Sequence, residues 1–124
     1  MIQRPRRELD ELTVARLAGA AWRNASGPEP SAAEAAVAVR ELREVAAGRG
    51  DLLAEVTGLL IGYYRRTAEE ARARGAAYLC IAAGASLEVI PQWIEVGCSR
   101  AAAARLIPPA VPETRQVYEW PEAV

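Results

Sequence analysis

Residues 78–106 constrain the fold of this chain most, because they combine the spacing of a helix-turn-helix with a proline. Gly84 lies in a run of small residues, and Ile90 and Trp93 follow at the offsets of a second helix. Glycine supplies the positive φ that a turn between two such helices needs. Pro91 falls where that second helix should already be under way, although a proline inside a helix removes a hydrogen bond.

Pro91 is therefore predicted to start a helix rather than to interrupt one. The N–H that proline lacks has no partner at the first position of a helix, so its absence costs nothing there. We expect one helical turn over residues 86–90, followed by a last helix that ends near residue 106. Four prolines follow in residues 107–124, so this tail is expected to be extended.

Helical periodicity also places a first helix at residues 8–23, with Leu9, Leu12 and Leu17 turned inward. A capping box of Ser31 and Glu34 starts a second helix. The buried stripe of this helix is predicted from apolar residues at helical spacing, which are Ala35, Val39, Leu42 and Ala46. The helix is expected to end at Gly48 and Gly50.

A third helix is expected at residues 52–64, with Asp51 as its cap. Its dense apolar face predicts the central helix of the fold, and its members are Leu52, Val56, Leu59, Leu60 and Tyr63. Gly58 and Gly62 lie four residues apart on this helix. That spacing permits a neighbouring helix to approach closely.

Thr67 and Glu70 have the spacing of a second capping box, which favours a separate fourth helix up to Gly84. One continuous helix over residues 52–83 is the alternative. No strand pattern of useful length is present. The sequence thus predicts an all-α fold, which is a compact bundle of four to five helices with a helix-turn-helix-like C-terminal pair. The bundle is expected to form one domain at residues 1–106, followed by an extended Pro-rich tail at residues 107–124.

Composition excludes several kinds of chemistry. All 15 basic residues are arginine, so the chain has no histidine for a Ser-His-Asp or Cys-His site. Two cysteines, Cys80 and Cys98, cannot complete a zinc site alone. Cys98 is expected to be a small buried residue. The glutamates, Glu55 among them, are expected on exposed helix faces, so we expect no enzyme, no cofactor and no metal.

The expected location is the cytoplasm. The N-terminus has no apolar segment typical of a signal peptide, and the longest strongly apolar run, residues 56–61, is too short to cross a bilayer. We therefore expect no membrane partner and reduced cysteines.

One functional alternative is a helix-turn-helix regulator that binds DNA. Arg4, Arg6 and Arg7 would form a basic arm of the kind that enters a minor groove, and Ser86 and Gln92 would lie at the major groove. The net charge of −1 argues against this alternative. So do two carboxylates, Glu88 and Glu95, on the side that would face phosphates.

The preferred hypothesis is a non-catalytic protein, an adaptor or regulatory subunit, that acts by protein-protein interaction and forms a homodimer. Dimers are the commonest oligomers. Tyr118 and Trp120 are the predicted partner-binding residues, because in an extended tail both side chains point the same way. The alternative for the tail is that it folds back onto its own domain.

Two runs carry a resemblance to a family. Residues 50–56, GDLLAEV, and residues 90–97, IPQWIEVG, resemble signatures of small, uncharacterised all-helical proteins of high-GC Gram-positive bacteria. Cys98 and Ser99 depart from the basic residues usual after the second run. The resemblance spans residues 41–105 and implies a helical, cytosolic protein but no activity.

Overall fold

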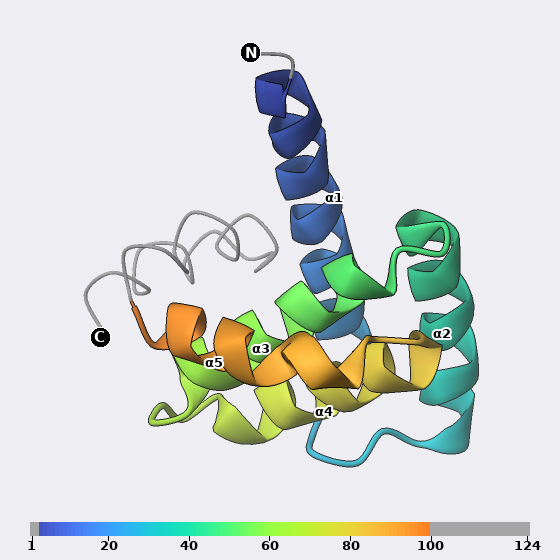
Figure 1. The fold of residues 1–124 in the computed structure, drawn as a ribbon. Coiled ribbons are helices and arrows are strands. Elements are labelled where there is room, and N and C mark those ends of the chain that lie inside the picture. The colour runs from blue at the N-terminus through green and yellow to red at the C-terminus, as the bar shows by residue number, and fades with distance from the viewer. Residues whose placement is uncertain (1–2, 100–124) are drawn as a thin grey trace.

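The computed structural model describes the backbone of residues 3–99 and the side chains of residues 9–99 (Figure 1). Within this range the chain forms five α-helices and one 3-10 turn, without any strand. In order, they are α1 (Gln3–Asn24), α2 (Ala32–Ala46), α3 (Gly50–Tyr64), α4 (Glu70–Ala83), the 3-10 turn η1 (Leu87–Val89) and α5 (Ile90–Cys98). The predicted all-α bundle is confirmed, and the tail at 107–124 lies outside the described residues.

The predicted central helix is confirmed as α3. It contacts α1, α2, α4 and α5, and α5 passes in front of it in Figure 1. The predicted apolar face is buried, but so is almost every other position of the helix. Glu55 is buried with them at 1% exposure, so the prediction that it lies on an exposed face is wrong.

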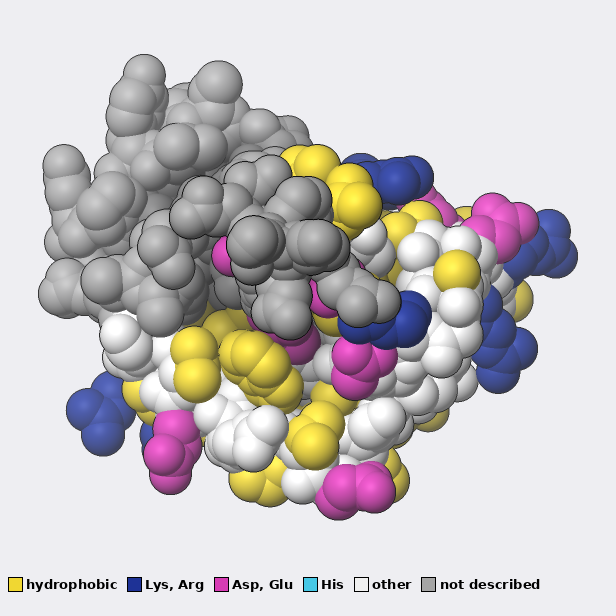
Figure 2. All heavy atoms as spheres, turned by 45° about the horizontal axis from the view of Figure 1, so that its top comes forward, with side chains coloured by type: hydrophobic (Ala, Val, Ile, Leu, Met, Phe, Trp, Pro, Cys, Tyr) yellow, Lys and Arg dark blue, Asp and Glu magenta, His cyan; other side chains and the backbone are white. Residues whose placement is uncertain are grey.

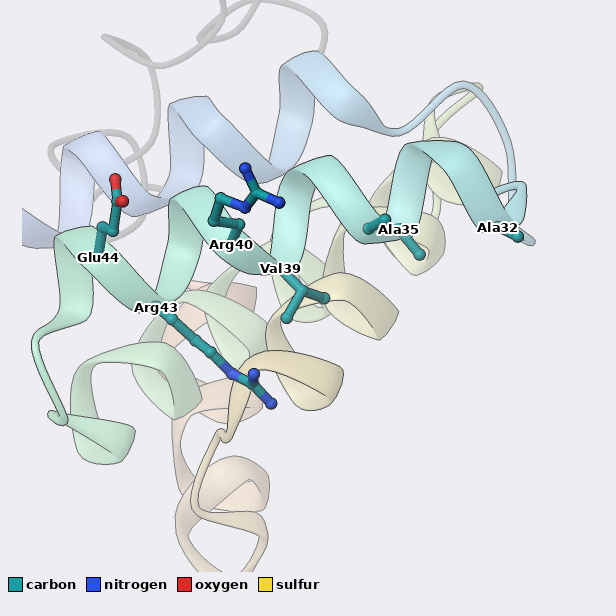
Figure 3. A pocket seen from close by; sticks show the side chains of 7 residues that line it. Ala32, Ala35, Val39, Arg40, Arg43 and Glu44 are labelled. Atoms are coloured by element: carbon teal, nitrogen blue, oxygen red, sulfur yellow. The ribbon is translucent and has the colours of Figure 1, made fainter.

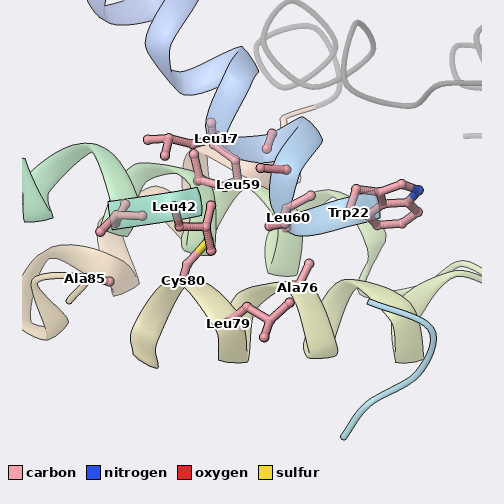
Figure 4. Packing of buried hydrophobic residues seen from close by; sticks show 14 of the residues in the cluster. Leu17, Trp22, Leu42, Leu59, Leu60, Ala76, Leu79, Cys80 and Ala85 are labelled. Carbon is pink, nitrogen blue, oxygen red and sulfur yellow. The ribbon is translucent and has the colours of Figure 1, made fainter. Parts of the chain in front are cut away.

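The core forms where α3 meets α1, α2 and α4 (Figure 4). Fully burying one leucine side chain contributes about 1.5–3 kcal/mol. Trp22 extends the core at the end of α1 by stacking on Tyr64, with ring centroids 4.7 Å apart. The large side chains of the core include Leu17, Leu42, Leu59, Leu60 and Leu79.

Glycines let α3 and α5 pack against each other, as the spacing of Gly58 and Gly62 predicted. A Cβ added at Gly58 would lie 2.8 Å from the carbonyl oxygen of Ile90, and one at Gly62 would overlap the carbonyl oxygen of Ile94. The contacts advance together along both helices, so the two helices run parallel. Gly97 completes this glycine seam from α5, since its added Cβ would lie 2.7 Å from a backbone oxygen of α3.

α2 begins as predicted. The Glu34 N–H donates to Ser31 Oγ at 3.1 Å, and the Ser31 N–H donates to Glu34 Oε1 at 3.0 Å, which is the capping box. The helix ends at Ala46, two residues before Gly48, because Ala47 itself adopts the left-handed conformation with φ 50°. Gly48 follows with φ 85°.

The break between α3 and α4 is also confirmed, so the single long helix over 52–83 is excluded. The capping details differ from the prediction. Thr67 lies in the connection, where its hydroxyl donates to the Tyr64 carbonyl at 3.0 Å and accepts from the Glu69 N–H at 3.1 Å. Arg49, not Asp51, precedes the first turn of α3, and no side chain caps that helix.

The C-terminal elements follow the predicted order. Gly84 ends α4 with φ 118°, η1 makes one turn, and Pro91 occupies the first turn of α5. α5 ends at Cys98, where Ser99 turns to an extended conformation, so the predicted end near residue 106 is wrong. α4 and α5 are joined as in a helix-turn-helix, but the main neighbour of α5 is α3 rather than α4.

Candidate interaction surfaces

The N-terminal half of α1 projects from the bundle (Figure 1). Leu9 and Leu12 on this half are 63% and 62% exposed, so the prediction that they face the core is wrong. Leucines three residues apart share one helix face. In α1 this face differs from the one on which Val14 and Leu17 are buried in the core. We call Leu9 and Leu12 the leucine pair.

Arg4, Arg6 and Arg7 lie within the first two turns of α1. Arms that enter a minor groove are extended segments outside a helix. The backbone at these three positions is helical instead, which differs from the arm that the alternative hypothesis required.

A small ion-pair network fixes the base of the projecting half to the start of α3. Arg49 Nη2 lies 3.3 Å from Asp10 Oδ2 and 2.9 Å from Asp51 Oδ2. The hydrogen bond from Arg49 is the largest of the influences that lower the pKa of Asp51. All three side chains reach solvent, so the network orients α1 more than it stabilises the fold.

A second arginine holds the other end of α1. Arg72 donates to the carbonyl oxygens of Trp22 and Ala25, at 2.8 Å and 2.9 Å, and its guanidinium lies 4.5 Å from the Trp22 ring centroid. Arg74 binds Glu70 at 3.1 Å. The arginines of the segment 65–74 are thus partly committed to structural contacts.

Ser86 and Gln92 occupy different surroundings. Ser86 is half-buried, and its N–H donates to the Gly50 carbonyl at 3.0 Å, which ties η1 to the start of α3. Gln92 is exposed on α5 together with Glu95. No arginine occurs in the described segment 87–99, so the face that would meet DNA carries carboxylates instead.

Charges of both signs are interspersed on the face seen in Figure 2. Arginine side chains gather at its rim, and carboxylates lie among them and between apolar side chains. A phosphate-binding surface needs a concentrated positive field. The described side chains on this face do not provide one.

α2 carries a shallow, open hollow of about 600 Å³ (Figure 3). Val39 and Arg43 point toward α4 in this view, whereas Arg40 and Glu44 lie on the side of α1. The sequence did not single out this surface. Its lining is mostly alanine, and the residues are Ala32, Ala35, Ala36, Val39, Arg40, Arg43 and Glu44.

The two cysteines are free and differ in environment. Cys80 is buried in α4, and burial raises the pKa of its thiol to about 12. Cys98 is exposed at the end of α5, where its sulfur accepts a hydrogen bond from Arg65 Nη1 at 3.4 Å. The prediction that Cys98 is buried is therefore wrong.

Among residues 3–99, no group of three or more Cys, Asp or Glu side chains is placed to hold a metal ion. In the same part of the chain, no helix has the length and apolar character to cross a membrane. The predicted partner-binding residues Tyr118 and Trp120 lie outside the described residues.

Comparison with protein-family models, with curated proteins and with solved structures finds no match to this chain.

Proposed function

We propose that the protein is a non-catalytic interaction protein, an adaptor or regulatory subunit, that forms a homodimer through the leucine pair of α1. The observation that carries this proposal is the exposure of both leucines, above 60% each, on a helix segment that the bundle leaves uncovered. Covering an apolar pair on a projecting helix with another helix removes apolar surface from water, and this stabilises the contact between the two helices.

A second copy of the chain is the proposed occupant. In a two-fold dimer the same patch serves both partners, so each leucine pair would pack against its counterpart. The contact is short, since twelve residues of α helix span only about 18 Å. Such a small interface supports a weak, concentration-dependent dimer.

Light scattering coupled to size-exclusion chromatography tests this proposal on the full chain. We expect the wild type to shift from monomer toward dimer as its concentration rises, and L9E/L12E to stay monomeric. Val37→Glu is the matched control, because Val37 is also an exposed helical residue, at 60% exposure, but lies on α2. A wild type that is monomeric at all concentrations would contradict the homodimer.

The tail, residues 107–124, is proposed as a second interaction surface of the adaptor, in addition to the dimer contact of α1. Tyr118 and Trp120 are proposed to bind a partner protein, and the experiment is a pull-down from native cytosol with the full chain and with Y118A/W120A. Loss of a specific partner in the variant, with an unchanged dimer, supports the proposal. Equal capture by both proteins removes the tail from it.

DNA binding remains the alternative, and the observation in its favour is the exposed Gln92. An electrophoretic shift assay at low salt, with the wild type and with Arg4, Arg6 and Arg7 changed to alanine, tests it. Salt-dependent binding that these changes abolish would favour a regulator of transcription over an adaptor.

A further inference from the structure

Asp10 continues, by one turn, the face of α1 that is buried in the bundle. Asp10, Val14 and Leu17 are four and three residues apart, so they share one helix face. Val14 and Leu17 are fully buried, and Val14 is the first buried residue among the side chains of α1 that the structure describes. A contact at Asp10 therefore attaches α1 to the bundle one turn beyond the core.

The leucine pair lies on another side of the same turn. At 3.6 residues per turn, Leu9 and Leu12 lie about 100° and about 160° around the helix axis from Asp10, in the same sense. Both leucines also precede Val14, so the turn that carries them lies outside the part of α1 that the core holds. A contact that turns Asp10 toward the bundle therefore turns the leucine pair outward.

Arg49 makes this contact from the start of α3. Its Nη1 and Nη2 donate to the two carboxylate oxygens of Asp10, at 3.4 Å and 3.3 Å. Two hydrogen bonds between a planar guanidinium and a planar carboxylate fix their relative direction, which a single contact between charges does not. The contact thus limits both the tilt and the rotation of this turn of α1.

Arg49 is itself held before it reaches α1. Its Nε and Nη2 donate to the two carboxylate oxygens of Asp51, at 3.0 Å and 2.9 Å. Its backbone lies between Gly48, with φ 85°, and Gly50, where an added Cβ would lie 2.6 Å from the Gly84 carbonyl oxygen. The close approach to the end of α4 fixes the backbone, and Asp51 fixes the guanidinium.

We propose that Arg49 is a positioning residue for the homodimer, which holds the first turns of α1 through Asp10 so that the leucine pair faces a second copy in one orientation. A helix segment that is ordered before binding loses less conformational entropy in the complex. The role in the dimer rests on the proposed function, whereas the attachment of α1 does not. Because Arg49 reaches solvent, salt weakens its contacts and thereby the dimer.

Light scattering over a range of concentrations measures the effect on the dimer. Arg49→Gln, which removes the charge, should raise the dissociation constant about threefold to tenfold. Arg49→Lys keeps the charge but not the paired hydrogen bonds, so it should recover part of this loss. Arg23→Gln is the matched control, because it removes the ion pair with Glu41 near the other end of α1, and it should change the constant less than about twofold.

The salt dependence distinguishes positioning from a general loss of stability. Between about 0.1 M and about 1 M salt, the screening length falls from about 10 Å to about 3 Å. The dissociation constant of the wild type should rise toward that of R49Q over this range. The constant of R49Q should not rise, because the apolar contact that remains is not weakened by screening.

Amide hydrogen exchange in the monomeric variant L9E/L12E tests the attachment of α1 without the dimer. Addition of R49Q should speed the exchange of residues 9–13 at least about threefold and leave residues 18–22 unchanged, since the core holds the second half of α1. Addition of R23Q should not speed the exchange of residues 9–13. Equal exchange of residues 9–13 with and without R49Q would overturn the attachment.

The two measurements separate this proposal from the proposed function. Faster exchange of residues 9–13 together with an unchanged dissociation constant for R49Q would overturn the positioning role and leave the dimer standing. A wild type that stays monomeric would remove the dimer and the role of Arg49 in it. The exchange in L9E/L12E would then still decide whether Arg49 holds α1.

Discussion

The glycine seam between α3 and α5 and the projecting half of α1 are opposites in composition and in packing. The seam brings backbones together at Gly58, Gly62 and Gly97, which have no side chain to bury. The projecting half carries two leucines, and both are exposed. Apolar residues therefore do not mark the packed surfaces of this protein by themselves. What decides burial is whether another helix can reach the surface.

Gly62→Ala is the sharpest way to break the seam, and we expect the largest effect from it. The added methyl group would overlap the Ile94 carbonyl oxygen, which is backbone and cannot rotate away. We expect a loss of about 3 kcal/mol in the free energy of unfolding, after the higher helix propensity of alanine has been counted. Urea denaturation measures this loss.

Gly27→Ala is the control for this prediction, because a Cβ at Gly27 meets nothing within 4 Å. Its stability should stay near that of the wild type. Equal stability of G62A and G27A would show that α3 and α5 are not in the close contact described here.

The two halves of α1 allow a comparison within one helix. Leu17 is fully buried and Leu12 is 62% exposed, so Leu17→Ala should cost about 3 kcal/mol, whereas Leu12→Ala should change stability by less than about 0.5 kcal/mol. Thermal unfolding at low protein concentration, where self-association does not contribute, measures both. Similar losses would mean that the bundle covers the leucine pair after all.

Ala47→Gly tests the left-handed conformation that ends α2 in the packed bundle. Ala47 adopts φ 50° at the end of α2, a conformation that glycine reaches without a steric penalty. We expect a gain of about 0.5–1 kcal/mol from the relief of this strain. Denaturation midpoints of A47G and wild type decide the sign, and a loss of stability would contradict the left-handed cap.

The smallest effect concerns the link between the two regions. Arg49 lowers the pKa of Asp51, so the pair contributes stability above the unfolded pKa of Asp51. This contribution is lost as the pH falls through the lower folded pKa. The carboxylate is exposed, so after allowance for solvent screening Asp51→Asn should cost at most about 0.5 kcal/mol near neutral pH.

Urea titrations of D51N and wild type at neutral and acidic pH measure this difference. It should shrink at acidic pH and in high salt. A difference that grew as the pH fell would contradict the ion pair.

Much of the fold could be predicted from local patterns. Residues that act through their own backbone and near neighbours have the predicted roles. The capping box of Ser31 and Glu34 starts α2, Gly84 ends α4, and Pro91 lies in the first turn of α5. The spacing of Gly58 and Gly62 predicted a close helix contact. It could not predict that α5 makes this contact, because the partner depends on how the chain folds in three dimensions.

The candidate surfaces were harder to predict, because burial is a tertiary property. The periodicity of Leu9 and Leu12 is the same whether or not a neighbour covers them. Glu55 shows the converse, since an acidic residue lies inside a helix that is covered on nearly all sides. A glutamate in the middle of the most apolar helix was the available signal, at a spacing of three and seven residues from Gly58 and Gly62.

Photo-crosslinking at position 12 tests the central proposal, that the leucine pair meets a second copy of the chain, most directly. A photoreactive aromatic residue replaces Leu12 in the full-length protein, and the same residue replaces Val37 in the control. We expect covalent dimers from position 12, joined between the α1 segments of two chains, and none from position 37. Absence of dimers from position 12 at concentrations where light scattering detects association, or equal yields from both positions, would contradict the account.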